Sequence, residues 1–363
     1  MTEKKALVAM SGGVDSSVAA YLLKNDGYSL IGAMMKLYNS EEHEQTRGCC
    51  GINDADDARA VAAALDMPFY VFNFMDEFKK EVIDRFISAY ESGETPNPCI
   101  DCNRFLKFGR FIRRAKELDT KYIATGHYAK IELRGGRYLL KTGTDPQKDQ
   151  SYVLYAMTQD ELAHTIFPLG GLTKETVRKV ASEQGFVNAN KRDSQDICFA
   201  PDKNYAGFIK NYTGKEYEPG RFVSPCGKTL GFHKGFIHYT IGQRKGLGLY
   251  GQNPVFVQKM NQKNNTITVC ESDSLFSRHL TAREINLIPF DKLDQKHKCK
   301  AKIRYAHTPA DAIIWQTDTD CLHVEFEKPQ RAITPGQAVV FYDKDVVIGG
   351  GIISSCPGGS SNP

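Results

Sequence analysis

Short apolar runs alternate with segments of helical spacing through residues 1–205. Four such runs predict β-strands, at 6–10, 29–35, 69–72 and 122–125. Apolar side chains recur at helical spacing between them, first at Val14, Val18 and Leu22, then over 55–65 with Asn53 as a cap, and over 78–90 with Gly93 at the end. Strands that alternate with helices are typical of an α/β fold with a doubly wound parallel sheet, which binds its ligand at the carboxyl ends of the strands.

The pattern changes after residue 205, where glycines become frequent and helical periodicity disappears. Short β-rich runs follow, at 254–259, 266–270, 300–305 and 338–342. We therefore expect an α/β domain at 1–205, a central β-rich domain at 206–280 and a small β-barrel at 281–356. The tail at 357–363 is typical of disorder. Within the first domain, Gly135-Gly136 predicts a hairpin.

Ser11-Gly12-Gly13-Val14-Asp15-Ser16, called the phosphate loop below, lies between the first strand and the first helix. Adjacent glycines let backbone N–H groups approach an anion, and the N-terminus of a helix adds partial positive charge. Ser11 and Ser16 can donate hydroxyl hydrogens. The segment therefore predicts a phosphate-binding site, with an ordinary glycine-rich turn as the alternative.

The spacing of this loop differs from that of the common P-loop, which has four residues between its glycines and a lysine after the second. Here Asp15 stands where a phosphate would tolerate a carboxylate only with a metal ion between them. The loop resembles the PP-loop of the ATP pyrophosphatases, which split ATP between its α- and β-phosphates and leave AMP on an oxygen.

Composition adds limits on partners and location. No apolar stretch approaches the roughly 20 residues of a membrane-spanning helix, and Met1–Lys5 lead directly into the first strand, so we expect a cytoplasmic protein without a membrane partner. The net charge of +4 permits a nucleic-acid partner without requiring one. Basic residues cluster at 104–116 and 292–304, but charge runs are more often solvated faces than binding sites.

The chain has 10 cysteines, which are not expected to form a disulfide framework without an export signal. Cys99 and Cys102 form a Cys-x-x-Cys motif after two prolines that make the turn rigid. Cys102 lies at or beside the start of a predicted helix, where the helix dipole, Arg104 and Lys107 favour the thiolate. Half of a zinc site is the alternative, but the sequence contains no second Cys-x-x-Cys motif to complete it.

Cys198 ends the polar run Asp193–Ile197 and precedes Phe199, a pattern that by itself indicates a loop anchor. The remaining cysteines are expected to be packing residues: Cys49, Cys50, Cys226, Cys270, Cys299, Cys321 and Cys356.

Six motifs occur in one order along the chain: SGGVDS at 11–16, TPNPCIDCN at 95–103, GHY at 126–128, DQSY at 149–152, DSQDICF at 193–199 and YTIGQRKG at 239–246. In this order they resemble the bacterial tRNA-specific 2-thiouridylases, members of the PP-loop superfamily that place sulfur on C2 of the wobble uridine (position 34) of tRNA. The resemblance extends from the first strand to about Cys356.

The resemblance implies an ATP site at the phosphate loop and at the ends of two further strands. Its residues are Ala9, Met10, Ser11, Gly12, Gly13, Val14, Asp15, Ser16, Met35 and Gly126. AMP is transferred to the C2 oxygen of the uridine, which makes that oxygen a good leaving group. Mg²⁺ balances the phosphate charge, with Asp15 as its expected partner.

By the same resemblance, Cys198 carries a persulfide and Cys102 is the nucleophile. Either the terminal sulfur of Cys198 attacks C2, or Cys102 first releases it as sulfide; both routes end in a Cys102–Cys198 disulfide that must be reduced. The implied partners are tRNAs of the Lys, Glu and Gln type and a sulfur-donor protein, a cysteine desulfurase or a sulfur-relay protein.

The resemblance also implies contacts with the tRNA, whose target base must leave the anticodon stack. Asn97, Pro98 and Cys99 contact the target base. The other implied tRNA contacts are His127, Asp149, Gln150, Ser151, Arg304, Tyr305 and Gln337. A core histidine is the alternative for His127, and an exposed barrel surface is the alternative for Arg304 and Gln337.

Cys99 departs from well-known family members that carry an aspartate assigned as general acid or base at this position. A thiol fills that role only with a suitable pKa. We expect Cys99 to line the pocket of the target base. The alternative is an iron–sulfur cluster held by Cys99, Cys102 and Cys198, since three cysteines suffice for a cluster with one open iron.

Two rival functions remain at this point. Another PP-loop enzyme, such as an amide- or guanidine-forming ligase, would need neither Cys102 and Cys198 nor an RNA-binding barrel. A nucleotide-dependent RNA-binding module without catalysis would bind RNA but would not turn over ATP.

Overall fold

Two compact units make up the chain. The structure, a computed structural model, describes residues 4–38, 52–193, 197–200, 202–249 and 253–354. Unit 1 comprises Met1–Ile83, Pro98–Lys203 and Asp345–Val347, and unit 2 comprises Asp84–Asn97, Asn204–Lys344 and Ile348–Pro363. The Cys-x-x-Cys motif therefore belongs to unit 1, whereas the preceding Asn97 belongs to unit 2.

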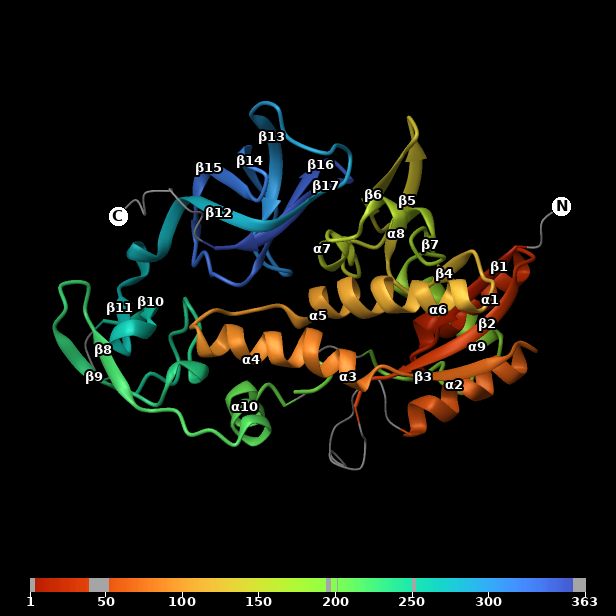
Figure 1. Cartoon of the computed structure of the whole chain (residues 1–363), viewed down its shortest axis with the longest axis horizontal. Helices are drawn as coiled ribbons and strands as arrows, with labels where there is room; N and C mark the ends of the chain where they lie inside the picture. The colour runs from red at the N-terminus through yellow and green to blue at the C-terminus, as the bar shows by residue number, and fades with distance from the viewer. Residues whose placement is uncertain (1–3, 39–51, 194–196, 201, 250–252, 355–363) are drawn as a thin grey trace. The chain divides into compact units, whose positions relative to one another are not determined.

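A parallel sheet lies at the centre of unit 1 (Figure 1). Its strands are β1 (Lys5–Ala9), β2 (Ser29–Lys36), β3 (Phe69–Asn73), β4 (Tyr122–Ala124) and β7 (Thr165–Ile166). They are all paired in parallel, in the order β3-β2-β1-β4-β7. Because the chain moves outward from β1 to β3 and then returns to β4 on the other side of β1, the strand order reverses between β1 and β4. The predicted doubly wound fold is confirmed.

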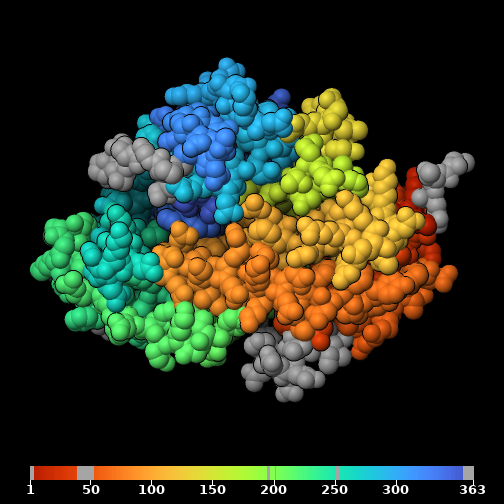
Figure 2. Space-filling model, viewed as in Figure 1, coloured from red at the N-terminus to blue at the C-terminus, as the bar shows by residue number. Residues whose placement is uncertain are grey.

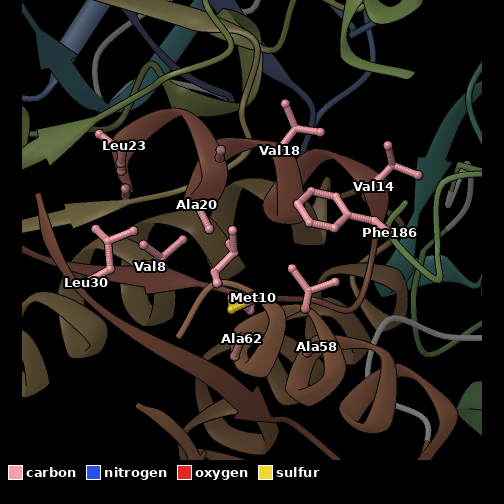
Figure 3. Close-up of a cluster of buried hydrophobic side chains, with 14 of the residues drawn as sticks. Val8, Met10, Val14, Val18, Ala20, Leu23, Leu30, Ala58, Ala62 and Phe186 are labelled. Atoms are coloured by element: carbon pink, nitrogen blue, oxygen red, sulfur yellow. The ribbon is translucent and has the colours of Figure 1, made fainter. Parts of the chain in front are cut away.

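Helices α1 (Val14–Asn25), α2 (Ile52–Ala64) and α9 (Lys174–Glu183) supply apolar side chains to the core of this unit. Val8 of β1, Val18 of α1 and Ala58 of α2 are fully buried in one cluster (Figure 3). Helix α2 includes Asn53, so the prediction that Asn53 caps this helix from outside is wrong. The helical spacing that predicted α1 and α2 marks the faces that pack in this core.

The helical spacing over 78–90 is realised as three consecutive segments. These are α3 (Met75–Phe78), the π-helical η2 (Lys79–Ile83) and α4 (Asp84–Glu91), of which α4 lies in unit 2. Helix α4 ends two residues before Gly93, close to the predicted end, and Gly93 has a φ of +78° that favours glycine.

A second helical run carries the Cys-x-x-Cys motif. It consists of α5 (Pro98–Asp101), the π-helical η3 (Cys102–Arg110) and α6 (Phe111–Glu117), and Figure 1 shows these segments as one continuous coil. Figure 2 shows the orange-to-yellow part of the chain, which contains this run, at the surface. One face of the run packs in the core, since Leu106 and Phe111 are fully buried.

A hairpin of β5 (Ala129–Arg134) and β6 (Arg137–Thr142) turns at Gly135 and Gly136, as predicted. Their φ values of +60° and +80° are those of a tight hairpin turn that glycine adopts without strain. Two short helices, α7 (Ser151–Leu154) and α8 (Gln159–Ala163), follow the hairpin.

Unit 2 begins its second segment with helix α10 (Tyr205–Thr213), which contradicts the expectation that helices end near residue 205. A four-stranded sheet follows, in the order β10-β11-β8-β9. Its strands are β8 (Gly220–Val223), β9 (Thr229–His233), β10 (Phe256–Asn261) and β11 (Thr266–Cys270). Short 3-10 turns occur at η4 (Phe236–His238), η5 (Gln262–Asn264) and η6 (Ser272–Leu275).

Six strands close into the predicted barrel. They are β12 (Phe276–Leu287), β13 (His297–Lys302), β14 (Ala310–Asp318), β15 (Cys321–Arg331), β16 (Ala338–Asp343) and β17 (Val346–Ile353). Pairing of β12 with β17 closes the order β12-β15-β14-β13-β16-β17, around a core that includes Phe326 and Phe341. The run 300–305 extends beyond β13, which ends at Lys302.

Two further predictions fall on residues outside those described. They concern the tail at 357–363 and the packing of Cys49, Cys50 and Cys356. Among the described residues, no helix combines the length and the apolar character needed to cross a membrane.

Candidate active site

The phosphate loop joins the carboxyl end of β1 to the N-terminus of α1, so its predicted strand–loop–helix context is confirmed. Ser16 Oγ donates to the Gly13 carbonyl at 3.0 Å and accepts from the Ser11 N–H at 3.2 Å, which closes the loop on itself. Gly13 is the N-cap residue and has no side chain to cap the helix. An N-terminus of this kind presents backbone N–H groups and positive dipole charge to an anion.

Two glycines lie too close to neighbouring backbone to carry a side chain. A Cβ on Gly12 would clash with the Asp54 carbonyl oxygen, and Gly12 has a φ of +70°. A Cβ on Gly126, which follows β4, would lie 2.8 Å from the Asp15 carbonyl carbon. The structure thus brings together the ends of β1 and β4. Met35 is partly buried near the carboxyl end of the neighbouring β2.

Gly12→Ala is expected to weaken ATP binding and to destabilise unit 1, because it adds a clash to a strained backbone; strain of this kind costs about 1–3 kcal/mol. The measurements are nucleotide titration and urea unfolding. Gly27→Ala is the matched control, since Gly27 has a φ of +81° but open space around an added Cβ. Equal effects of the two substitutions on nucleotide affinity would contradict the close approach at Gly12.

Asp15 faces a lysine and a tyrosine from distant parts of the sequence. Lys174 Nζ lies 2.8 Å and 2.9 Å from the two carboxylate oxygens, and the Tyr128 hydroxyl donates to Oδ1 at 2.7 Å. Burial raises the pKa of Tyr128, and the negative charge of Asp15 raises it further, so its hydroxyl stays protonated and donates. These contacts hold the carboxylate at the phosphate loop.

Lys174 also reaches Asp193, the first residue of the DSQDICF motif, at 2.8 Å. Asp193 binds two further cations, Lys148 and Arg178, each at 2.7 Å. Burial opposes ionisation of Asp193, but the hydrogen bonds from Lys148 and Lys174 outweigh it and lower the pKa of the carboxyl to about 2. Asp193 is therefore ionised at neutral pH.

The segment after α9 supports the loop from the other side. Asn188 Nδ2 donates to the Gly12 carbonyl at 3.0 Å, and Lys191 Nζ donates to the same oxygen at 3.1 Å. Lys191 also pairs with Asp54 and Asp57 of α2, at 2.5 Å and 2.6 Å. Burial disfavours the charge on Lys191, but these two carboxylates outweigh it and raise its pKa.

The sequence did not indicate this support: Lys174, Asn188 and Lys191 were not among the candidate residues, and Tyr128 and Asp193 entered only as parts of the GHY and DSQDICF motifs. One local signal was available. Thr173 caps α9, so Lys174 takes the first helical position, where a positive charge opposes the helix dipole. A lysine at such a position, buried to 9% exposure, indicates a charged partner elsewhere in the fold.

The cysteines of the Cys-x-x-Cys motif differ in position and exposure. The helical run begins at Pro98, a favoured first residue, so Cys99 rather than Cys102 lies in its first turn. Cys99 is exposed and Cys102 is partly buried, at the start of the π-helical segment. Such segments are frequent at functional sites.

Cys198 is partly buried in the same unit as Cys102. The following Phe199 packs edge-on against Phe78 of α3, with ring centroids 5.9 Å apart. In the part of the chain that the structure describes, Cys99, Cys102 and Cys198 do not form a group of ligands suited to a metal ion. Among these residues, the iron–sulfur alternative thus lacks a preformed ligand set.

Asp15 is the carboxylate of the phosphate loop, and it already accepts hydrogen bonds from Lys174 and Tyr128. Mg²⁺ commonly binds one or two carboxylates together with substrate phosphates and water, rather than a cage of protein ligands. A Mg²⁺ ion at Asp15 would therefore share or replace these contacts.

His127 is buried, with its ring 5.9 Å from Phe108 and 5.8 Å from Phe167. Nδ1 lies 2.5 Å from Thr125 Oγ1, and Nε2 lies 3.5 Å from Lys107 Nζ. Burial, and then the positive charge of Lys107, hold the pKa of His127 well below its usual value. The neutral ring positions Lys107, a residue of the basic cluster.

Asp149, Gln150 and Ser151 form a self-supporting turn beside Tyr128. Asp149 accepts hydrogen bonds from the Ser151 hydroxyl at 2.8 Å and N–H at 3.2 Å. Gln150 Oε1 accepts from the Tyr128 N–H at 3.0 Å. This turn therefore fixes the backbone of the tyrosine that holds Asp15.

Within unit 2, the barrel holds the segment before the Cys-x-x-Cys motif. Gln337 Nε2 donates to the Thr95 carbonyl at 2.7 Å, and the Thr95 N–H donates to the Pro335 carbonyl at 2.9 Å. Asn97 follows this anchor by two positions. Arg304 is exposed and Tyr305 is 43% exposed after β13.

Ion pairs reduce the charge of both basic clusters. On the helical run, Arg114 pairs with Glu117 at 2.5 Å and Lys116 with Asp160 at 3.8 Å. In the barrel, Lys300 pairs with Asp311 at 2.9 Å. These exposed pairs fit solvated faces as well as a polyanion site.

The other described cysteines only partly follow the packing prediction. Cys270 is buried, and burial raises the pKa of Cys299 to about 12. Cys226 is exposed and its thiol lies 3.0 Å from Ser224 Oγ, so the prediction that it packs is wrong. Cys321 is in a disulfide, which the prediction did not anticipate.

Three family descriptions match consecutive parts of the chain. They are the "tRNA methyl transferase HUP domain" at residues 4–202, the "tRNA methyl transferase PRC-barrel domain" at 206–271 and the "Aminomethyltransferase beta-barrel domain" at 277–353. Among solved structures, the NMN synthetase from Francisella tularensis covers 60% of this chain and 79% of its own, with a TM-score of 0.34 and 16% identity.

Full-length relatives are much closer. The tRNA-specific 2-thiouridylase MnmA of Clostridium beijerinckii is 50% identical over 355 residues, which is 97% of this chain and 99% of the relative. The corresponding protein of Clostridioides difficile is 48% identical over 353 residues, 96% of this chain and 98% of the relative. The chain belongs to the tRNA-specific 2-thiouridylase family.

Proposed function

We propose that this protein catalyses the ATP-dependent 2-thiolation of the wobble uridine of tRNA, by adenylation of the C2 oxygen followed by sulfur transfer from a cysteine persulfide. The observation that carries the proposal is the supported phosphate loop, in one unit with Cys102 and Cys198, in a chain that matches its relatives over nearly their whole length. Another PP-loop ligase would not need Cys102 and Cys198, and an RNA-binding module without catalysis would not need a phosphate loop in the same unit as these cysteines.

Adenylation solves the first chemical problem, the poor electrophilicity of the C2 carbonyl carbon. The phosphate loop binds the phosphates of ATP through N–H groups at the start of α1. Asp15 would hold Mg²⁺, which supplies charge neutralisation at the phosphates. The C2 oxygen attacks the α-phosphorus, pyrophosphate leaves, and the oxygen becomes part of a good leaving group.

Sulfur transfer then follows one of two balanced routes. In the first, the terminal sulfur of the Cys198 persulfide attacks C2 and AMP leaves; the Cys102 thiolate attacks the Cys198 sulfur and breaks the S–S bond, which leaves 2-thiouridine. In the second, Cys102 attacks first and releases sulfide, which displaces AMP. Both routes form a Cys102–Cys198 disulfide, which a cellular dithiol reduces by two electrons.

The remaining assignments concern binding. We assign the target base to Asn97, Pro98 and Cys99. Further tRNA contacts are assigned to His127, Asp149, Gln150, Ser151, Arg304, Tyr305 and Gln337. The hydrogen bond of Gln337 to Thr95 supports a shared role for the barrel and the Asn97 segment. A cysteine desulfurase or sulfur-relay protein loads Cys198, and the requirement for a reductant fits the cytoplasm.

Cys99→Asp is expected to keep substantial activity, and Cys99→Ala to lose less than about a hundredfold, the lower end of the contribution of a general acid or base. The reason is that an exposed residue lining a base pocket contributes packing rather than an essential proton transfer. The measurement is 2-thiouridine formation by each purified variant. Stoichiometric iron and sulfide, lost together with activity in Cys99→Ala, would instead establish the cluster.

Mass spectrometry of wobble uridine tests the function itself. Cells lacking the gene are expected to lose 2-thiouridine at position 34 and to regain it when the gene is re-expressed. Unchanged 2-thiouridine in those cells would refute the proposal.

A further inference from the structure

Lys174 links two parts of the site that are distant in sequence. Its ammonium contacts Asp15 in the phosphate loop and Asp193 at the start of the segment that carries Cys198. We propose that Lys174 is a positioning residue that couples nucleotide binding at the phosphate loop to the placement and reactivity of Cys198. The inference rests on the proposed function, because it assumes that ATP binds this loop and that Cys198 carries the sulfur.

The bonding capacity of Lys174 is already filled. A lysine ammonium has three N–H donors, and Nζ lies 2.8 Å and 2.9 Å from the oxygens of Asp15 and 2.8 Å from Asp193 Oδ1. An incoming phosphate oxygen or Mg²⁺ must therefore compete for one of these contacts. A phosphate oxygen that accepts a hydrogen bond from Lys174, or a cation that binds Asp15, changes the strength of the ion pair between Lys174 and Asp193.

The placement of Lys174 favours a functional bridge over a surface ion pair. Its side chain is 11% exposed, and it occupies the first residue of α9, where its charge opposes the helix dipole. Its backbone N–H is held by Asp145 Oδ2 at 3.0 Å, so the position of the main chain is defined independently of the ammonium. The cost of burying the ammonium at this point is offset by its contacts with both carboxylates.

Three cations and three carboxylates meet around the bridge. Lys148 and Arg178 join Lys174 opposite Asp15 and Asp193, and Asp145 accepts a hydrogen bond from the Lys174 N–H. The charges of the group therefore balance, and Lys174 is the cation that contacts both Asp15 and Asp193. A polyphosphate chain that approaches Asp15 meets Lys174 as the nearest cation of the group.

Asp193 and Cys198 lie in the same short stretch of sequence. Five residue steps separate them, so their Cα atoms lie within about 18 Å even when the chain is extended. The other side of Cys198 is anchored by Phe199, which is 7% exposed and packs against Phe78. Cys198 thus follows a charged anchor at Asp193 and precedes an apolar anchor at Phe199, and we expect its reactivity to depend on whether Asp193 stays paired with Lys174.

The test measures the reactivity of Cys198 in the full-length protein with and without nucleotide. Iodoacetamide labelling is quenched at intervals and followed by peptide mass spectrometry, in Mg²⁺ with saturating ATP analogue whose α,β-bridge is a methylene group. The exposed Cys226 of unit 2 serves as an internal reference. In the unmodified protein, the nucleotide is expected to change the labelling rate of Cys198 by about fivefold or more, the range of typical coupling energies.

Lys174→Met is expected to remove this response, and Lys174→Arg to retain part of it because the charge remains. Lys179→Met is the matched control, since Lys179 lies on the same helix but is 75% exposed and pairs only with Glu183 among the ion pairs described. Asp193→Asn keeps the size of the side chain, removes its charge and must also abolish the response. If Lys174→Met does not fold, the labelling response of Asp193→Asn tests the coupling in its place.

Two outcomes would overturn the coupling. In the first, bound nucleotide does not change the labelling rate of Cys198 in the unmodified protein. In the second, nucleotide changes that rate in Lys174→Met or Asp193→Asn as much as in the unmodified protein. Calorimetric titration with the analogue establishes that nucleotide is bound in each case. The result is separate from the proposed function, which fails only if cells lacking the gene keep 2-thiouridine.

Discussion

Cys198→Ser is expected to reduce 2-thiouridine formation by at least about a thousandfold, because loss of the cysteine that covalently carries the sulfur removes most of the chemical rate. A serine oxygen cannot accept sulfane sulfur from a donor, so no persulfide forms on the variant. Cys102→Ser is expected to show the complementary defect. Its Cys198 thiol is intact and accepts sulfur, but the Cys198 S–S bond is not cleaved, and transfer stalls after loading.

The two steps are measured separately, with ³⁵S-labelled donor for persulfide loading and nucleoside mass spectrometry for thiolation. Cys226→Ser is the control, since Cys226 is an exposed cysteine of unit 2. Label on Cys102 instead of Cys198 would reverse the two assignments. Normal thiolation by both variants would exclude the persulfide mechanism.

Asp15→Ala is expected to lower adenylation by about a hundredfold to a thousandfold, the usual effect of removing one electrostatic contact to the reacting group. The substitution removes the proposed Mg²⁺ ligand and leaves the buried Lys174 without one of its two carboxylates. Ser11→Ala is also expected to lower adenylation, because Ser11 lies at the entrance of the loop and is exposed. Affinity for tRNA should remain nearly unchanged in both, since the basic clusters are elsewhere.

AMP formation and tRNA filter binding separate these effects. Asp26→Ala is a matched control, because Asp26 is an exposed carboxylate at the other end of α1. Full AMP release by Asp15→Ala and Ser11→Ala would contradict the assignment of the loop. A parallel loss of tRNA affinity would indicate that the substitution damages the fold.

Four of the five sheet strands and the presence of a C-terminal barrel were predictable because their signals are local, whereas the two-residue strand β7 carries no such signal. A parallel strand buried on both faces is a continuous apolar run, and the helices around it repeat apolar residues at helical spacing. Helix α10 was missed because its nine residues include glycine, threonine and two tyrosines, which are weak helix formers. Its stability comes from burial of Ala206 and Ile209, which a local pattern does not reveal.

The phosphate loop was recognisable for the same reason: six contiguous residues contain both the glycines and the start of the helix. The residues that support it were not recognisable. Lys174 meets Asp15 across 159 positions of sequence, and Asn188 meets Gly12 across 176. Charged and amide side chains at such separations carry no pattern that identifies their partners.

By itself, the sequence determined the first four strands and the helices α1 and α2 between them, the phosphate loop and the set of cysteines available for sulfur chemistry, because each depends on residues that are neighbours along the chain. Only the tertiary structure decided that Lys174 joins Asp15 to Asp193 and that the barrel residue Gln337 holds Thr95. The physical reason is that these contacts form when sheet order and barrel closure bring distant segments within hydrogen-bonding distance, and burial then makes each charge depend on its partner.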